Sequence, residues 1–235
     1  MKKNLLTGIF SNLALIFLIG VLFFTCLNAP ASVNAFKPIY KGEEKSGGVA
    51  IMINVYQGAE YVEKILDILA AEKATCTFFV GGVWAEKNCE LLKKMSEQAE
   101  IGNHGYLHRD HKNIGEKENR DEIALCHKLV EKVLDRQMTL FAPPSGSYSD
   151  TTLSVAESMG YSVIMWTKDT IDWRDKDYEL ITKRAVSDIQ SGDLVLMHPT
   201  EQTVKALPYI LREYKRKNLV TMTVSEILSF DPNSY

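Results

Sequence analysis

The chain has 235 residues, of which 46% are hydrophobic and 24% are charged, and its formal net charge is −3. This is the composition of an ordinary globular protein, and the length fits one large domain. No basic block and no interleaving of basic with aromatic residues occurs, which argues against nucleic acid as a partner. A charge this small predicts no strongly charged partner of any other kind.

The first 35 residues have the pattern of an export segment. Lys2 and Lys3 precede an apolar run at residues 13–27, and residues 33–35 end in small side chains, as signal peptidase sites do. A cleaved signal peptide and an uncleaved signal anchor both remain open, because the apolar stretch 5–27 is nearly long enough to span a membrane. Either way, the protein is expected to be exported, and then secreted or anchored to the outer face of the cytoplasmic membrane.

The rest of the chain predicts a short linker, one α/β domain at residues 49–230 and a tail at 231–235. Residues 36–48 are polar and rich in Gly, Lys and Glu, which is typical of a linker. Buried strands are predicted at 49–54, 75–80, 99–101, 138–141, 161–166, 194–197 and 219–221. Helices are predicted at 61–71, 85–98, 119–134, 150–159, 178–190, 203–217 and 224–229.

About seven strand–helix pairs with non-alternating strands indicate a parallel sheet covered by helices. An open doubly wound sheet and a closed barrel both satisfy this pattern. The barrel is favoured because Asn54, His104, Ala142-Pro143, Asp169 and His198 each follow the end of a different strand. In a barrel these ends converge on one mouth, where sites are built. We expect such a domain to be a monomer.

The cysteines give no sign of a metal site or a redox pair. Cys76, Cys89 and Cys126 lie in the exported part, and their spacing matches no known metal knuckle. One disulfide among the three is an open alternative, but buried free thiols are favoured.

Two histidines four residues apart provide the strongest chemical signal. The segment 104–108 reads H-G-Y-L-H, and imidazoles at this spacing can approach one divalent metal ion such as zinc. The alternative is a loop with two solvated histidines. Asp110 and His111, which follow, are expected to face solvent.

Three further segments have an equally specific order. Residues 142–146 read A-P-P-S-G, residues 169–173 read D-T-I-D-W, and residues 194–198 read L-V-L-M-H. Together with the histidine pair, they resemble the motifs of the polysaccharide deacetylase family, carbohydrate esterase family 4, and in particular its sporulation-associated, membrane-anchored branch. The resemblance covers residues 49–230. It implies a distorted parallel (β/α) barrel of about seven strands that removes acetyl groups from peptidoglycan or chitin-like sugars with one divalent metal, zinc being favoured.

The resemblance also implies roles for individual residues. His104 and His108 would bind the metal. His198 would be the general acid, with Asp169 polarising it, while Asp172 would serve only backbone donors of its loop. The substrate groove would be lined by Pro143, Pro144, Trp173 and Leu196.

Three positions depart from the family pattern, and all three concern the acidic half of the site. Asn54 takes the place of the catalytic-base aspartate, Val55 that of a metal-ligand aspartate, and Ala142 that of the arginine that orients the base. A register that aligns Gly58 with the motif glycine puts Tyr56 and Gln57 at the two aspartate positions instead, and neither register supplies a carboxylate. A general base contributes roughly 10²–10⁴ in rate, and an amide does not replace it. The sequence therefore supports two hypotheses: a deacetylase with a weakened site and weak or lost metal binding, or a non-catalytic glycan-binding or scaffold protein on the same fold.

Overall fold

The computed structural model describes residues 37–229. The export segment 1–35 and the tail 231–235 lie outside these residues, so the predictions about them are not tested. Within the described range, no helix combines the length and the apolarity that crossing a membrane requires.

The described residues form one curled parallel sheet whose strands run in the order β5-β4-β3-β2-β1-β7-β6, with β8 paired to β1. Its strands are β1 (Gly48–Val55), β2 (Thr77–Val80), β3 (Glu100–Asn103), β4 (Leu140–Phe141), β5 (Ser162–Val163), β6 (Lys168–Asp169), β7 (Leu194–Met197) and β8 (Val220–Met222). The expected distorted parallel barrel is confirmed. The sequence did not predict β6, because two residues leave no periodicity to detect.

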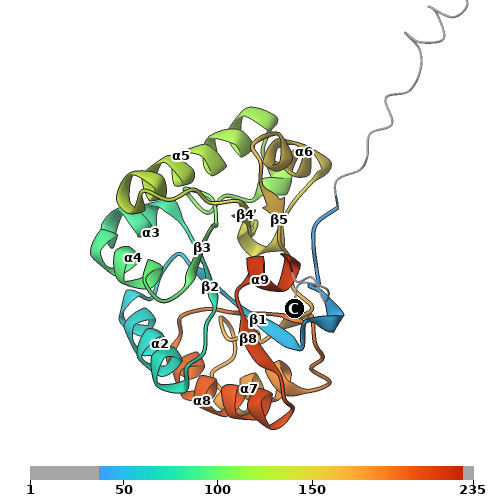
Figure 1. The fold of residues 1–235 in the computed structure, drawn as a ribbon. Helices are drawn as coiled ribbons and strands as arrows, with labels where there is room; N and C mark the ends of the chain where they lie inside the picture. The colour runs from blue at the N-terminus through green and yellow to red at the C-terminus, as the bar shows by residue number, and fades with distance from the viewer. Residues whose placement is uncertain (1–36, 230–235) are drawn as a thin grey trace, which may run out of the picture. The chain divides into compact units, whose positions relative to one another are not determined.

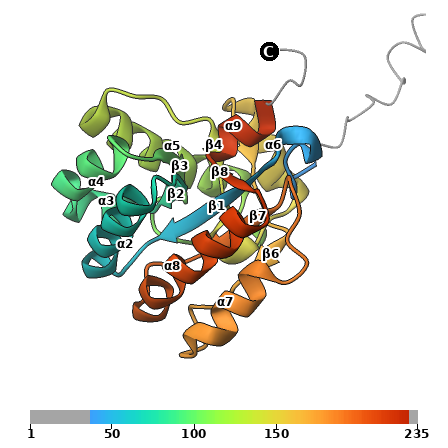
Figure 2. The same cartoon turned by 60° about the horizontal axis from the view of Figure 1, so that its bottom comes forward.

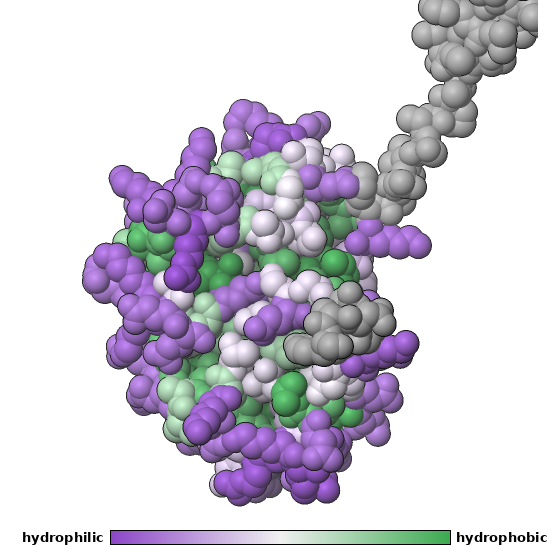
Figure 3. Space-filling model, viewed as in Figure 1, coloured by the Kyte–Doolittle hydropathy of each residue, from purple (hydrophilic) through white to green (hydrophobic). Residues whose placement is uncertain are grey.

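Helices surround the strands, as Figures 1 and 2 show. They are α2 (Ala59–Glu72), α3 (Gly82–Lys87), α4 (Cys89–Ser96), α5 (Glu116–Leu134), α6 (Asp150–Ser158), α7 (Tyr178–Val186), α8 (Glu201–Arg216) and α9 (Val224–Ser229). The predicted helix 85–98 is in fact two helices, broken at Asn88, whose side-chain amide donates to the Trp84 carbonyl. Hydrophilic residues cover the outer helices (Figure 3).

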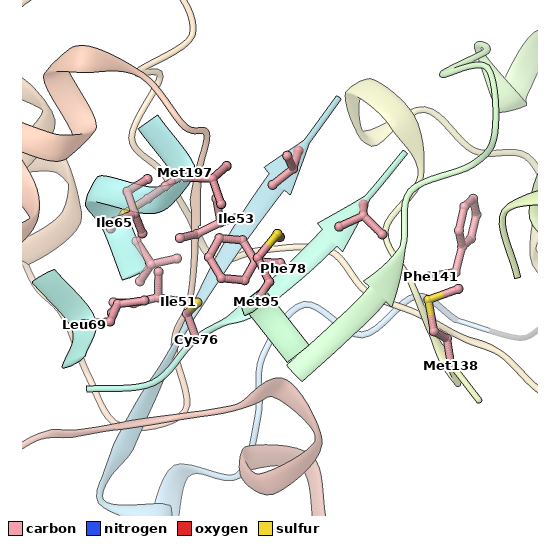
Figure 4. Packing of buried hydrophobic residues seen from close by; sticks show 14 of the residues in the cluster. Ile51, Ile53, Ile65, Leu69, Cys76, Phe78, Met95, Met138, Phe141 and Met197 are labelled. Carbon is pink, nitrogen blue, oxygen red and sulfur yellow. The ribbon is translucent and has the colours of Figure 1, made fainter. Parts of the chain in front are cut away.

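Two apolar layers lie on opposite faces of the strands, because successive strand residues point to opposite sides. In β1, Ile51 and Ile53 belong to the larger layer, which packs against the surrounding helices (Figure 4). Ala50 and Met52 belong to a smaller layer inside the barrel, together with Phe79. Helix α9 closes the amino-terminal end of this inner layer with Val224 and Ile227. Site residues must therefore continue the inner series.

The barrel is left open between β5 and β6, the two ends of the strand order. Part of the segment predicted to be a linker packs beside this opening. Ile39 forms a parallel bridge with Ile164, and its side chain packs on the inner layer. The Gly42 N–H donates to the Gly192 carbonyl at 2.7 Å. Residues 39–42 thus contribute to the domain rather than merely preceding it.

The cysteine thiols within residues 37–229 are free, as the favoured alternative expected. Cys76 and Cys126 are buried in the larger apolar layer. Burial raises the pKa of Cys126 to about 12 and raises that of Cys76 as well, so both thiols stay protonated at neutral pH.

Candidate functional site

A pocket of about 370 Å³ opens at the carboxyl ends of the strands. This volume falls within the range of roughly 300–1,000 Å³ that is typical of small-molecule sites. The pocket is lined by Asn54, Tyr56, His104, His108, Ser145, Gly146, Trp166, Asp169, Trp173, Leu196 and His198. Of the strand-end residues that the sequence singled out, Asn54, His104, Asp169 and His198 meet at this mouth, whereas Ala142 and Pro143 are buried and do not line it.

The alternation of strand residues explains which side chains reach this pocket. Asn54 continues the inward series of Ala50 and Met52 along β1, and His198 continues that of Leu194 and Leu196 along β7. Leu196 lines the pocket, as expected.

Val55 has the opposite orientation to Asn54. Its side chain is fully buried in the outer layer with Ile51 and Ile53. The sequence assigned it to the position of a metal ligand, but the structure directs it away from the pocket. Tyr56, two residues after Asn54, is the β1 neighbour that lines the pocket instead.

His104 is held in one tautomer. Its Nδ1 lies 2.7 Å from the Ala142 carbonyl oxygen, which can only accept, so Nδ1 carries the hydrogen and Nε2 is left as the acceptor. Burial, and to a lesser degree the neighbouring His108, lowers the pKa of His104 to about 3. Burial also lowers the pKa of His108. The two rings lie edge to face with centroids 5.1 Å apart.

A buried glutamate shapes the loop that carries both histidines. Glu122 of α5 is 4% exposed, and its Oε2 accepts from the backbone N–H groups of Tyr106 at 3.0 Å and Leu107 at 2.8 Å. The loop needs such support because both Gly105 and His108 adopt positive φ angles, of 74° and 58°. Sequence reasoning missed Glu122. The feature that could have revealed this residue is a carboxylate beside Ile123 on the apolar face of a predicted helix.

His111 does not face solvent, contrary to expectation. It is fully buried, its Nδ1 lies 2.7 Å from Asn119 Oδ1, and its ring packs 5.0 Å from that of Phe141. Asp110 is exposed and caps the short turn that follows it. His111 therefore has a structural position beneath the histidine loop.

The carboxylate paired with His198 is Asp172, so the expected pairing with Asp169 is wrong. Asp172 Oδ1 accepts from His198 Nδ1 at 2.8 Å, while its Oδ2 accepts from the His198 backbone N–H and the Thr203 hydroxyl, both at 2.6 Å. Asp172 is 3% exposed. Asp169 instead accepts from the Ile171 N–H at 2.8 Å and keeps its side chain at the pocket wall.

The remaining predicted groove residues divide into two groups. Trp173 is 58% exposed and lines the pocket, as a sugar-facing aromatic would. Pro143 and Pro144 lie beneath the surface and do not line it; the two residues that follow them, Ser145 and Gly146, do. The prolines stiffen the turn that presents these two residues.

Tyr56 packs on one of the two predicted metal ligands. Its ring centroid lies 4.0 Å from that of His108, with the planes tilted by 30°. The sequence placed Tyr56 at a motif aspartate only in the alternative register that aligns Gly58 with the motif glycine, and it gave this residue no role in the site.

The donors present do not fit a catalytic zinc site. Such sites use three protein ligands with an open fourth position. Among residues 37–229, no three His, Cys, Asp or Glu side chains converge closely enough to hold a metal ion. His104 and His108 are the only two of the expected ligands that reach the pocket, because Val55 points into the core. No chemical step through a metal follows from this arrangement.

The burial of His104 predicts an acid-sensitive stability. The unfolded chain binds a proton at this residue below its ordinary pKa of 6.5, whereas the folded chain does not until about pH 3. The contribution of His104 to the free energy of unfolding is therefore fully present above pH 6.5. It decreases as the pH falls towards 3, by at most about 1.4 kcal/mol per pH unit. Urea unfolding of the wild type and of His104→Asn at pH 7, 5.5 and 4 tests this. The variant should show a shallower acid slope, and equal slopes would contradict the prediction.

Comparison with known proteins identifies the family of this chain. The model of the polysaccharide deacetylase family matches residues 41–164. A peptidoglycan-N-acetylglucosamine deacetylase of Bacillus cereus is 33% identical over 189 residues, which cover 77% of this chain and 88% of that enzyme. The chain belongs to the polysaccharide deacetylase family.

Two further proteins have a similar level of sequence identity to this chain. The YlxY protein of Bacillus subtilis is 35% identical over 193 residues; the match covers 82% of this chain but only 60% of YlxY. A solved structure of a CE4 family pseudoenzyme from Bacillus anthracis superposes with a TM-score of 0.80 at 34% identity, covering 82% of this chain and 69% of that one. A mutant of that pseudoenzyme, described as having restored enzymatic activity, superposes equally well at 32% identity.

Proposed function

We propose that this polysaccharide deacetylase-family protein binds cell-envelope glycan in its pocket and does not hydrolyse it at an enzymatic rate. The observation that carries the proposal is the orientation of the β1 end. The two side chains that reach the pocket there are Asn54 and Tyr56, and neither is a carboxylate. The position that would bring a second acid, Val55, faces the core.

Three features support a glycan as the ligand. Trp166, Trp173 and Tyr56 line the pocket and offer flat apolar faces on which sugar rings stack. The Bacillus cereus relative is named a peptidoglycan-N-acetylglucosamine deacetylase, and the Bacillus anthracis relative is described as a pseudoenzyme. A cell-wall polysaccharide places the protein at the cell envelope, consistent with the export segment expected in residues 1–35.

A slow deacetylase is the second candidate function, and the His198–Asp172 pair favours it. A groove used only for binding has less need of an imidazole whose Nδ1 is fixed by a buried carboxylate. In this reading His104 and His108 would be the residues that hold a zinc ion weakly, and the protein would slowly hydrolyse the C–N bond of an N-acetyl sugar in peptidoglycan or a chitin-like polymer. We further propose that the protein is a monomer, that it is attached to the membrane if the export segment is uncleaved, and that it acts in sporulation.

Acetate release and glycan binding, measured on the same preparations, separate the two functions. The wild type with added zinc should release acetate from chitooligosaccharides or peptidoglycan at least about 10²-fold more slowly than the Bacillus cereus relative, yet should sediment with purified cell wall. Trp173→Ala should weaken this binding about tenfold, because it removes the exposed stacking face. Tyr209→Ala, which removes an aromatic of similar exposure from α8, should not. Acetate release at an ordinary enzyme rate would refute the binding role, and failure to bind cell wall would refute both functions.

A further inference from the structure

The inner end of the pocket presents hydrogen-bond acceptors. His104 Nδ1 donates to the Ala142 carbonyl, so the nitrogen left for a ligand is the acceptor Nε2. Asn54 lines the same pocket at 2% exposure, and its Oδ1 has no hydrogen-bond partner among the described residues. A buried acceptor without a partner is unfavourable unless a ligand supplies the donor.

The charged group at the pocket wall also favours a ligand that donates hydrogen bonds. Asp169 is the carboxylate among the lining residues, and these include no lysine and no arginine. Its Oδ1 accepts from the Ile171 N–H, which leaves Oδ2 for a ligand. Tyr56, Trp166 and Trp173 add aromatic faces, which attract cations through the negative potential of the ring. Acceptors, one carboxylate and three aromatic rings together favour a cation with several N–H donors.

We propose that the pocket recognises the free amine of a de-N-acetylated hexosamine in cell-wall glycan, in preference to the N-acetyl sugar. The ammonium group would donate to Asn54 Oδ1, His104 Nε2 and the Asp169 carboxylate, while the sugar ring lies against the aromatic residues. This inference rests on the proposed glycan-binding function and names its ligand. The amide hydrolysis that removes an N-acetyl group is the class of reaction that must supply such an amine.

An acetamide group fits the same residues less well. It offers one N–H and a carbonyl oxygen, and the oxygen needs a donor or a metal ion opposite it. The Asn54 side-chain NH2 can donate to this oxygen, but the single acetamide N–H then faces three acceptors, Asn54 Oδ1, His104 Nε2 and the Asp169 carboxylate, and the metal ligand set is incomplete. An ammonium group brings three N–H donors and no acceptor. The Ser145 hydroxyl, which also lines the pocket, remains available for the hydroxyl groups of the ring.

Calorimetry with two matched oligosaccharides tests the proposal. Glucosamine hexamer and N-acetylglucosamine hexamer are titrated into the full exported chain in EDTA, so that trace metal does not contribute. The amine form should bind about tenfold to a hundredfold more tightly, as expected for charge-assisted hydrogen bonds. Tighter binding of the N-acetyl form would overturn this inference and leave the glycan-binding function standing. Binding of neither hexamer, with no sedimentation on cell wall, would overturn the function itself.

Two substitutions with opposite expected effects test whether this pocket is responsible for the preference for the amine sugar. Asn54→Asp should tighten binding of glucosamine hexamer about tenfold, because it replaces a neutral acceptor with a charged one. Asp169→Asn should weaken it by a similar factor. Misfolding cannot explain a gain in affinity. The Asn54→Asp variant therefore still tests the proposal if Asp169→Asn is unstable.

The control is Asp67→Asn, which removes a carboxylate from the exposed face of α2 and should leave affinity unchanged. Lysine hexamer should bind at least tenfold more weakly than glucosamine hexamer, since it lacks rings to stack. If Asp67→Asn weakens binding as much as Asp169→Asn, or if lysine hexamer binds equally well, the preference reflects the net charge of the protein and the assignment to the pocket is overturned.

Discussion

Asn54→Asp combined with Tyr56→Glu is expected to create a metal site and measurable deacetylation of N-acetylglucosamine oligomers. Both positions line the pocket: Asn54 lies near the end of β1, and Tyr56 directly follows the strand. A glutamate at position 56 replaces the ring that packs 4.0 Å from His108, so its carboxylate is placed beside both histidines as a third ligand. An aspartate at position 54 supplies the missing base, with an expected gain of roughly 10²–10⁴ in rate.

Zinc stoichiometry and acetate release check this prediction in order. Metal binding should appear with Tyr56→Glu alone, and turnover only when Asn54→Asp is added, because groups that act as a unit are not additive. Ala142→Arg alone should do neither, since the arginine lacks a carboxylate to orient. A double variant that binds one zinc per chain and still releases no acetate would show that this pocket does not position the acetyl group for hydrolysis.

The Val55→Asp variant tests whether position 55 faces the metal site, as the family motif implies, or the core, as the structure shows. The alignment identifies Val55 as the missing metal ligand, so it predicts that Asn54→Asp, Val55→Asp and Ala142→Arg together restore the site. The structure buries Val55 completely among apolar side chains. An aspartate there should lower the free energy of unfolding by roughly 3 kcal/mol or more, because a charge is buried without a partner. A stable, zinc-binding Val55→Asp variant would contradict the orientation of β1 described above.

Asp172→Ala is expected to be far more destabilising than Asp169→Ala. Removing the Asp172 carboxylate leaves three donors without an acceptor: the His198 N–H, His198 Nδ1–H and the Thr203 hydroxyl. At about 1–3 kcal/mol for each orphaned donor, the loss should total roughly 3–5 kcal/mol, since His198 keeps some access to water. Asp169→Ala releases one backbone N–H and should cost less than about 1.5 kcal/mol.

Urea unfolding of the two variants at pH 7 measures this difference directly. The two aspartates are three residues apart in one loop, so each serves as the control for the other. Equal losses, or a larger loss in Asp169→Ala, would contradict the pairing of Asp172 with His198.

The long apolar strands were predictable from the sequence to within one or two residues. The β1 run at 49–54 and the β7 run at 194–197 are continuous and apolar because both faces of each strand are buried. Short elements were not predictable. Strand β6 has two residues, and the break at Asn88 depends on a side-chain hydrogen bond that no periodicity reveals.

The residue types of the site were predictable, but their pairing was not. Motif order identified His104, His108 and His198, which all line the pocket. It chose Asp169 over Asp172 as the partner of His198, which is wrong, because the Ile171 residue between them takes a φ of 55° and turns the loop. Burial of His111 was also missed, since it depends on Asn119 of a helix that follows it in the chain.

The hydrogen bonds that the Tyr106 and Leu107 amides donate to Glu122 lead to an expected heat-capacity change on glycan binding. The Glu122 carboxylate of α5 holds the course of the histidine loop through these two hydrogen bonds. The distance between the two imidazoles is thus established before any ligand arrives, so binding orders little additional backbone. The heat-capacity change on glycan binding should then match the apolar area covered by the sugar alone, without the larger negative value that accompanies folding on binding.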